Sequence, residues 1–173
     1  YARARALLAL ARAGEVDRVA EAAVLLPRLP VWSLARLCAD WAGLWSPSQR
    51  EQVRALAESA SNRAWAAEVF IALARAAPPA EAPADALRAL SCMRDDSGWL
   101  RGVWHVPVLA SVLSPEELRP FIHAHLLAAR TRADPAPAIA SLAPLADLPQ
   151  LERMVAMLAA PGGHDHAWDR AAG

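Results

Sequence analysis

Apolar residues recur along the chain with the spacing of an amphipathic helix. In the segments that follow Tyr1, Trp32 and Trp65, the positions five, six and nine residues after the aromatic are all apolar. These three positions lie on one stripe of a helix, because the α-helix turns once every 3.6 residues. The pattern therefore predicts a series of helices that each bury one face.

Aromatic residues lead successive segments at regular intervals, at Tyr1, Trp32, Trp65, Trp99 and Trp168. The long gap after Trp99 holds one more unit. Pro149 ends its segment as Pro78 ends the segment that begins at Trp65, and this alignment gives a degenerate start at Ala136. Units are therefore predicted to begin near residues 1, 32, 65, 99, 136 and 168. The mean spacing of about 33 residues is typical of a helix–turn–helix repeat.

One helix pair cannot bury both of its apolar faces, so stacking of neighbouring pairs completes the core. We therefore predict an all-α fold, an α-solenoid of about five repeats plus the start of a sixth, forming one domain over residues 1–173. Composition agrees with this prediction. The chain has 43 Ala and 24 Leu but only 14 Val and Ile together, and one Thr, whereas a β-sandwich or β-barrel needs many β-branched strand positions.

Several residues predict where helices begin and break. Ser46 and Ser114 each precede a proline, as an N-cap residue precedes the first helical position. Pro107 and Pro144 fall eight residues after their unit starts, and should kink or break those helices. The unit-leading tryptophans Trp32, Trp65 and Trp99 are expected to be mostly buried.

The helix–turn–helix unit with a leading aromatic resembles the tetratricopeptide-like superfamily, or HEAT-like arrays, in divergent form. After Trp65 the chain has Glu68-Val69 and Ala72 where the tetratricopeptide pattern has Leu-Gly and Tyr. The run from Tyr1 to Ala11, an aromatic followed by alternating Arg, Ala and Leu, is similar to degenerate repeats of bacterial STAND-type signalling and defence proteins. That resemblance implies a sensor or scaffold segment.

The charge balance and the two cysteines limit the cellular compartment and the classes of partner that we expect for this chain. All 18 basic residues are arginine and 18 residues are acidic, so no net field draws the whole chain to nucleic acid or to an anionic membrane. No stretch is long and apolar enough for a membrane span, and no signal peptide opens the chain. Cys38 and Cys92 lie in apolar helical segments, as buried thiols of a reducing, cytoplasmic compartment would.

Because the chain begins at Tyr1 rather than Met, we expect a fragment of a larger protein whose ends dock against other repeats, domains or subunits.

The sequence contains no phosphate-binding loop, nucleophile elbow or HExxH motif, so neither an enzyme nor a cofactor is expected. His123 and His125 point about 200° apart on one helix and cannot share a metal. The best set of possible metal donors is His164, Asp165 and His166, with Asp169 one turn later. We favour capping of a helix start by Asp165 and expect no metal, because a metal site needs three or four converging donors and nothing else nearby offers any.

Charged residues on the first helix of each unit lie away from the apolar stripe and are the candidate partner-binding residues: Arg3, Arg5, Arg36, Glu68, Arg75 and Arg101. The leading hypothesis is a non-catalytic scaffold or sensor that binds a protein or peptide, or other domains of the parent protein. A structural linker or autoinhibitory arm is the second hypothesis, and an RNA-binding helical repeat is the third. A clustered arginine and aromatic patch would favour binding, whereas ordinary solvated side chains would favour a linker.

Overall fold

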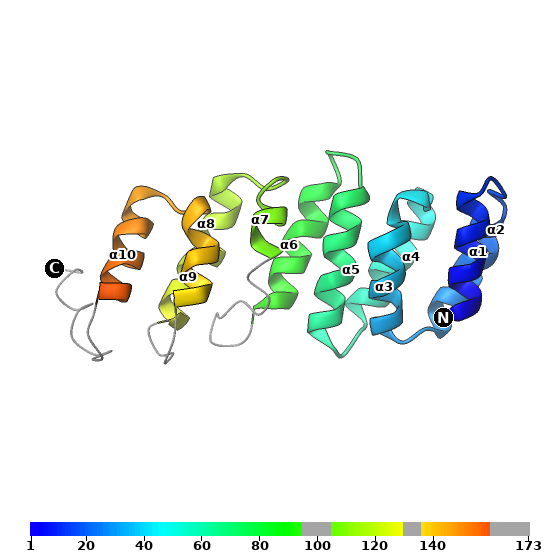
Figure 1. The fold of residues 1–173 in the computed structure, drawn as a ribbon, viewed down its shortest axis with the longest axis horizontal. Helices are drawn as coiled ribbons and strands as arrows, with labels where there is room; N and C mark the ends of the chain where they lie inside the picture. Colours follow the sequence, from blue (N-terminus) through cyan, green and yellow to red (C-terminus); the bar gives the residue numbers. More distant parts are fainter. Residues whose placement is uncertain (95–104, 130–135, 160–173) are drawn as a thin grey trace. The chain divides into compact units, whose positions relative to one another are not determined.

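The computed structural model describes residues 1–94, 105–129 and 136–159, and within them the secondary structure is helical without a β-strand (Figure 1). The all-α prediction is confirmed for this part of the chain. The α-helices and 3₁₀ turns are α1 (Ala2–Arg12), α2 (Arg18–Leu25), η1 (Leu26–Arg28), α3 (Val31–Trp41), η2 (Ala42–Leu44), α4 (Pro47–Glu58), α5 (Arg63–Ala76), α6 (Ala82–Met93), α7 (Val106–Leu109), α8 (Pro115–Ala129), α9 (Ala136–Leu142), η4 (Ala143–Leu145) and α10 (Leu148–Ala159).

The chain divides into two compact units, an N-terminal unit (Tyr1–Cys92) and a C-terminal unit (Met93–Gly173). Helices α1, α3, α5 and α9 begin at Ala2, Val31, Arg63 and Ala136, within two residues of four predicted unit starts. The starts predicted near residues 99 and 168 lie outside the described residues. Among the described residues, no helix is long and apolar enough to cross a membrane.

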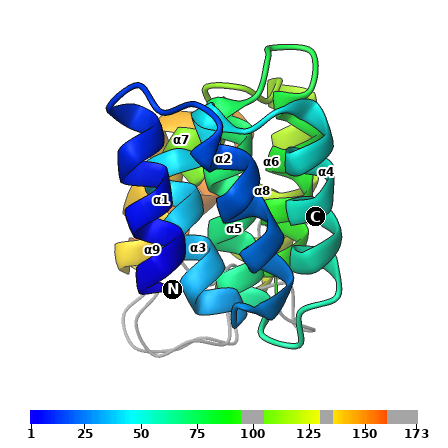
Figure 2. The ribbon, with the colours of Figure 1, turned by 90° about the vertical axis from the view of Figure 1, so that its right-hand side faces the viewer.

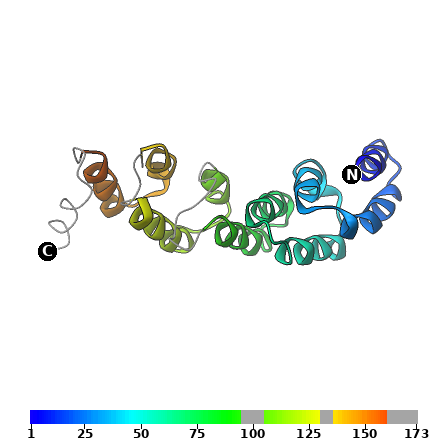
Figure 3. The same ribbon diagram turned by 90° about the horizontal axis from the view of Figure 1, so that it is seen from below.

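The helices of the N-terminal unit lie in two layers (Figures 2 and 3). Layer A contains α1, α3 and α5, which lie side by side and begin at the same edge of the unit. Layer B contains α2, α4 and α6. Helix α5 packs against α3 within its own layer and against α4 across the layers. All residues of α5 from Ala66 to Ala74 except Glu68 are buried, as expected for a central helix.

Large apolar side chains from both layers fill the core of the N-terminal unit. The largest fully buried side chains there are Leu8, Leu26, Leu34, Leu37, Phe70, Leu73 and Leu90. Alanines occupy many of the remaining buried positions, and their small side chains let the helices approach closely. The predicted apolar stripe is confirmed on α3 and α5, where Leu37, Trp41 and Phe70 are buried.

The stripe predicted for the first helix is wrong. On α1 the buried residues are Ala4, Leu8 and Ala11, whereas Leu10 is exposed. The reason is that α1 is the outermost helix of layer A in the N-terminal unit (Figure 2). Leu10 points about 200° away from Arg12, which contacts α3, so it lies on the flank that has no neighbour in this layer.

The predicted caps and breaks are present where they can be seen. Ser46 and Gln49 form a reciprocal capping box at the start of α4. In the C-terminal unit, Pro107 lies in the first turn of α7, which has only four residues. Helix α9 ends at Leu142, and Pro144 lies in the 3₁₀ turn that follows it. Pro144 therefore follows the end of its helix, as predicted, whereas Pro107 occupies a first turn, where the missing N–H breaks no helical hydrogen bond.

Acid should weaken the start of α8, because Ser114 and Glu117 form a capping box there. The Ser114 N–H and Oγ–H donate to a Glu117 carboxylate oxygen at 2.8 and 2.9 Å. These hydrogen bonds hold the pKa of Glu117 below its ordinary value of 4.5. A carboxyl group whose pKa is lower in the folded state stabilises that state above its unfolded pKa, and this contribution is lost as pH falls through the folded pKa.

Thermal unfolding of the chain and of Glu117→Gln, followed from neutral pH to below 4.5, tests this cap. The Tm difference between the two chains should be largest at neutral pH and shrink in acid. A Tm difference that stays constant with pH would contradict it.

Candidate functional site

Two exposed aromatic side chains meet where α1 and α3 begin. The ring centroids of Tyr1 and Trp32 lie 6.1 Å apart with planes inclined by 43°, a tilted aromatic contact. Tyr1 is 36% exposed and Trp32 is 44% exposed, and Trp65 at the start of α5 is 37% exposed. Each of the three helices of layer A thus begins with an aromatic side chain that is open to solvent.

The expectation that Trp32 and Trp65 are mostly buried is wrong. Trp32 is the second residue of α3 and Trp65 is the third residue of α5. The first turn of each helix lies at the edge of the unit, where a neighbouring helix covers only part of the ring. Trp99 lies outside the described residues.

Helix α3 exposes a single stripe. Its exposed residues are Trp32, Arg36, Ala39 and Asp40, which follow one another at helical spacing, while most of its other residues are buried. Arg36 lies one turn after Trp32, and Asp40 lies one turn after Arg36. This stripe is the surface that α3 presents to solvent.

On α1, the flank beside α3 carries Tyr1, Arg5 and Arg12, which share one stripe of the helix. Tyr1 contacts Trp32 at one end of this flank. At the other end, the Arg12 guanidinium lies 4.3 Å from the Trp41 ring centroid and donates to the Asp40 carbonyl at 2.8 Å. Arg5 lies between these two contacts along the same stripe of α1 and is exposed.

We call Tyr1, Arg5, Trp32 and Arg36 the aromatic–arginine seam. Arg5 follows Tyr1 by one helical turn, as Arg36 follows Trp32, so each arginine shares a stripe of its helix with one ring of the aromatic pair. Both arginines are exposed, and neither forms an ion pair with a residue that the structure describes. The seam thus combines apolar surface with available positive charge.

Of the predicted partner-binding residues, Arg5 and Arg36 lie together in the seam. Glu68 and Arg75 lie on α5, on the stripe that begins at Trp65. Arg3 points about 200° away from Arg5 and lies on the opposite flank of α1. Arg101 lies outside the described residues. The charged positions of the sequence thus predicted the two arginines of the seam. The exposure of Tyr1, Trp32 and Trp65 was not predicted, because regular spacing of aromatic residues is also typical of buried core positions.

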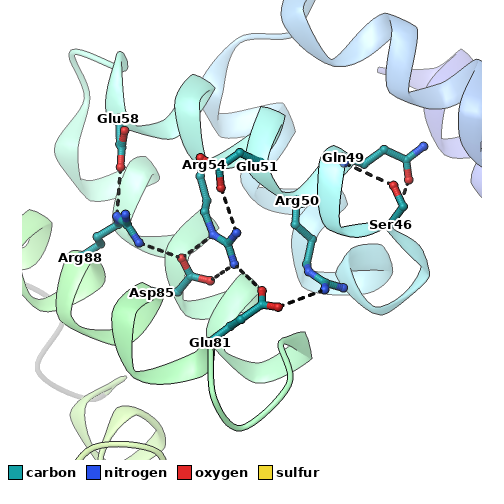
Figure 4. A network of polar contacts seen from close by, with 9 residues as sticks. All are labelled: Ser46, Gln49, Arg50, Glu51, Arg54, Glu58, Glu81, Asp85 and Arg88. Atoms are coloured by element: carbon teal, nitrogen blue, oxygen red, sulfur yellow. Dashed lines mark hydrogen bonds and ion pairs between the residues drawn. The ribbon is translucent and has the colours of Figure 1, made fainter.

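A second cluster of polar residues joins α4 to α6 in layer B (Figure 4). Arg54 binds both carboxylate oxygens of Asp85 at 2.9 Å, and also Glu81 and Glu51 at 3.1 Å. Arg88 binds Glu58 at 3.0 Å and Asp85 at 3.5 Å. The side chain of Asp85 is fully buried and that of Arg54 is only 12% exposed. The network therefore holds α4 and α6 together, and its charges are paired with one another.

Arg50 supports the same contact between helices. Its Nη1 donates to the Trp45 carbonyl at 3.0 Å, and its Nη2 lies 3.8 Å from Glu81. The hydrogen bonds that Arg54 donates to Asp85, Glu51 and Glu81 raise the pKa of Arg54, against the opposing effect of burial. Arg54 therefore stays protonated at any ordinary pH, and the network links α4 to α6.

Residues that could carry chemistry lie apart from one another in the described part of the chain. The described residues include no group of three or more His, Cys, Asp and Glu side chains able to hold a metal ion. His123 is exposed and His125 is buried on α8, and the set His164, Asp165 and His166 lies outside the described residues.

Cys38 and Cys92 are both buried and unbonded to each other, as predicted. Burial raises the pKa of the Cys38 thiol. Burial also raises the pKa of Cys92, partly opposed by the charge of Arg63. Both thiols are therefore poor nucleophiles in the folded chain.

No protein-family model matches the chain, and neither a curated protein nor a solved structure is significantly similar to it.

Proposed function

We propose that the chain is a non-catalytic scaffold or sensor module that binds a protein or peptide through layer A. The observation that carries this proposal is the aromatic–arginine seam, in which Tyr1 and Trp32 are exposed beside Arg5 and Arg36. Trp, Tyr and Arg are the residue types that most often dominate the energy of protein interfaces. Here all three gather on one surface.

We further propose that the helix pairs continue as a divergent tetratricopeptide-like or HEAT-like α-solenoid. The two-layer arrangement of the N-terminal unit and the spacing of the starts of α1, α3, α5 and α9 support this architecture. A sensor or scaffold segment of a bacterial STAND-type protein is the parent that we favour. The buried, unbonded thiols Cys38 and Cys92 support a cytoplasmic, reducing location.

Exposed aromatics distinguish this proposal from a structural linker. A linker needs only solvated side chains on its free surface, and exposing an aromatic ring to water costs free energy of about 25 cal/mol per Å² of apolar surface. Two rings in contact at the start of adjacent helices form a preformed apolar anchor site. A partner that covers them recovers that free energy.

The test is selection of a phage-displayed random peptide library on the immobilised full chain. Enriched peptides should bind the chain and should bind Trp32→Ala at least about tenfold more weakly, because truncation of an interface tryptophan commonly costs 2 kcal/mol or more. Affinities would be measured by the anisotropy of labelled peptides. Because Trp32 is 44% exposed, its truncation should lower the Tm only moderately, and far-UV circular dichroism would verify that the variant is folded.

Val24→Ala is the matched control. Val24 is an apolar residue on α2 in layer B and is 70% exposed, so its truncation should leave peptide affinity unchanged. If no peptide is enriched, or if the enriched peptides bind Trp32→Ala as well as the original chain, this surface is not the binding site and the proposal fails.

A further inference from the structure

We infer that the aromatic–arginine seam takes an acidic peptide segment with an apolar or aromatic anchor residue. This inference rests on the proposed function and adds the chemical class of the partner. Two observations carry it: the distribution of charge between the two layers, and the position of the arginines relative to the aromatic pair.

The balanced total charge of the chain conceals an asymmetry between the layers of the N-terminal unit. The helices of layer A carry six arginines and two acidic residues, a net charge of +4. The helices of layer B carry four arginines and four acidic residues, a net charge of zero. Layer A therefore presents a positive surface, which favours encounter with an acidic partner.

Acidic residues of the N-terminal unit are mostly neutralised away from the seam. Arg54 and Arg88 pair with the acids of α4, α6 and the loop between α5 and α6, as Figure 4 shows. Arg18 pairs with Glu15 and Glu21. Arg5 and Arg36, in contrast, have no ion pair among the described residues. An incoming carboxylate would therefore not have to displace an acid of the N-terminal unit from Arg5 or Arg36.

Geometry then limits the pattern of the peptide. Arg5 and Arg36 each lie four residues, about 6 Å along the helix axis, beyond Tyr1 and Trp32. An extended peptide rises about 3.3 Å per residue. A peptide whose anchor covers the aromatic pair therefore brings its side chains about two positions away to the arginines. Bidentate arginine–carboxylate pairing favours Asp or Glu at those positions.

Single-stranded nucleic acid is the competing occupant of a surface that combines aromatics with arginines. Asp40 lies on the same exposed stripe of α3 as Arg36. A continuous chain of phosphates following this stripe would meet the Asp40 carboxylate, whereas a peptide can place its acidic residues at the seam alone. The charge pattern therefore favours the peptide.

The experiment reads the composition of the peptides enriched by the full chain and their dependence on the seam arginines. Enriched peptides should carry an excess of Asp and Glu within about two positions of an apolar residue. Their affinity should fall about tenfold or more for the double variant Arg5→Gln/Arg36→Gln, and should fall with added salt. Asn and Gln versions of the same peptides should bind correspondingly more weakly.

The matched control is Arg3→Gln/Arg28→Gln, which removes the same charge from exposed positions outside the seam and should leave affinity nearly unchanged. Peptides that depend on Trp32 but lack an acidic excess, or that bind Arg5→Gln/Arg36→Gln as tightly as the original chain, would overturn this inference and leave the proposed function standing. Tighter binding of a single-stranded oligonucleotide through the same arginines would also overturn it. Absence of any Trp32-dependent peptide would overturn both.

Discussion

Replacing Asp85 by alanine is expected to lower the free energy of unfolding by about 3–5 kcal/mol. Asp85 is fully buried, and both of its carboxylate oxygens accept hydrogen bonds from Arg54. Arg54 is itself only 12% exposed, so the truncation leaves a charged guanidinium largely buried without its main partner. Denaturant unfolding of the full chain, followed by far-UV circular dichroism, measures the loss.

Glu51 offers a matched control, because it pairs with the same arginine but is 73% exposed. Glu51→Ala should cost less than about 1 kcal/mol, since solvent screens an exposed ion pair. The double variant Arg54→Met/Asp85→Leu should recover much of the lost stability, because it removes both charges. Equal losses for Glu51→Ala and Asp85→Ala would show that burial does not set the strength of this pair.

Phe70→Ala should also cost about 3–5 kcal/mol, because it opens a cavity at the centre of the N-terminal unit. Phe70 is 1% exposed and lies on α5, the helix that packs against both α3 and α4. Phe70→Leu keeps most of the volume and should cost less than about 1.5 kcal/mol. The same denaturant titration compares the two variants.

Trp65→Ala is the control for this second experiment. Trp65 is an aromatic of the same helix but is 37% exposed, so its truncation should cost clearly less than that of Phe70. If the two alanine variants were equally destabilised, α5 would not be the centre of the packing described above.

Hydrophobic periodicity was sufficient to predict the middle of the N-terminal unit. Helix α5 packs against both α3 and α4, and α3 packs against α5, so their apolar stripes are buried as the spacing predicts. Pro144 was equally informative, because α9 ends just before it, although α8 continues through Pro120. Predictions made from neighbouring residues were therefore correct where neighbouring residues determine the structure.

The predictions of burial were wrong where the exposure of a side chain depends on the position of its helix among the other helices. Leu10 has the spacing of a core residue but lies on the flank of α1 that has no neighbour in layer A (Figure 2). Trp32 and Trp65 recur at a repeat interval, yet they lie in first turns at the edge of the unit. Periodicity reports which residues share a face, and cannot report what lies against that face.

The polar network could not be derived from the sequence either. Arg54 and Asp85 are 31 residues apart, and nothing local distinguishes this pair from other charged residues of α4 and α6. For the same reason, equal numbers of arginines and acids did not reveal the positive layer A. Charge segregation depends on which helices share a layer.

The short helix α7 has a consequence for resistance to proteases. Its four residues contain hardly more than a single turn, so the backbone hydrogen bonds that normally reinforce one another along a helix are few. Its order therefore depends on the burial of Val106 and Leu109. Opening this turn exposes little surface and costs much less than global unfolding. Cleavage of the folded chain should consequently start around α7 well before it reaches the 14 residues of α5.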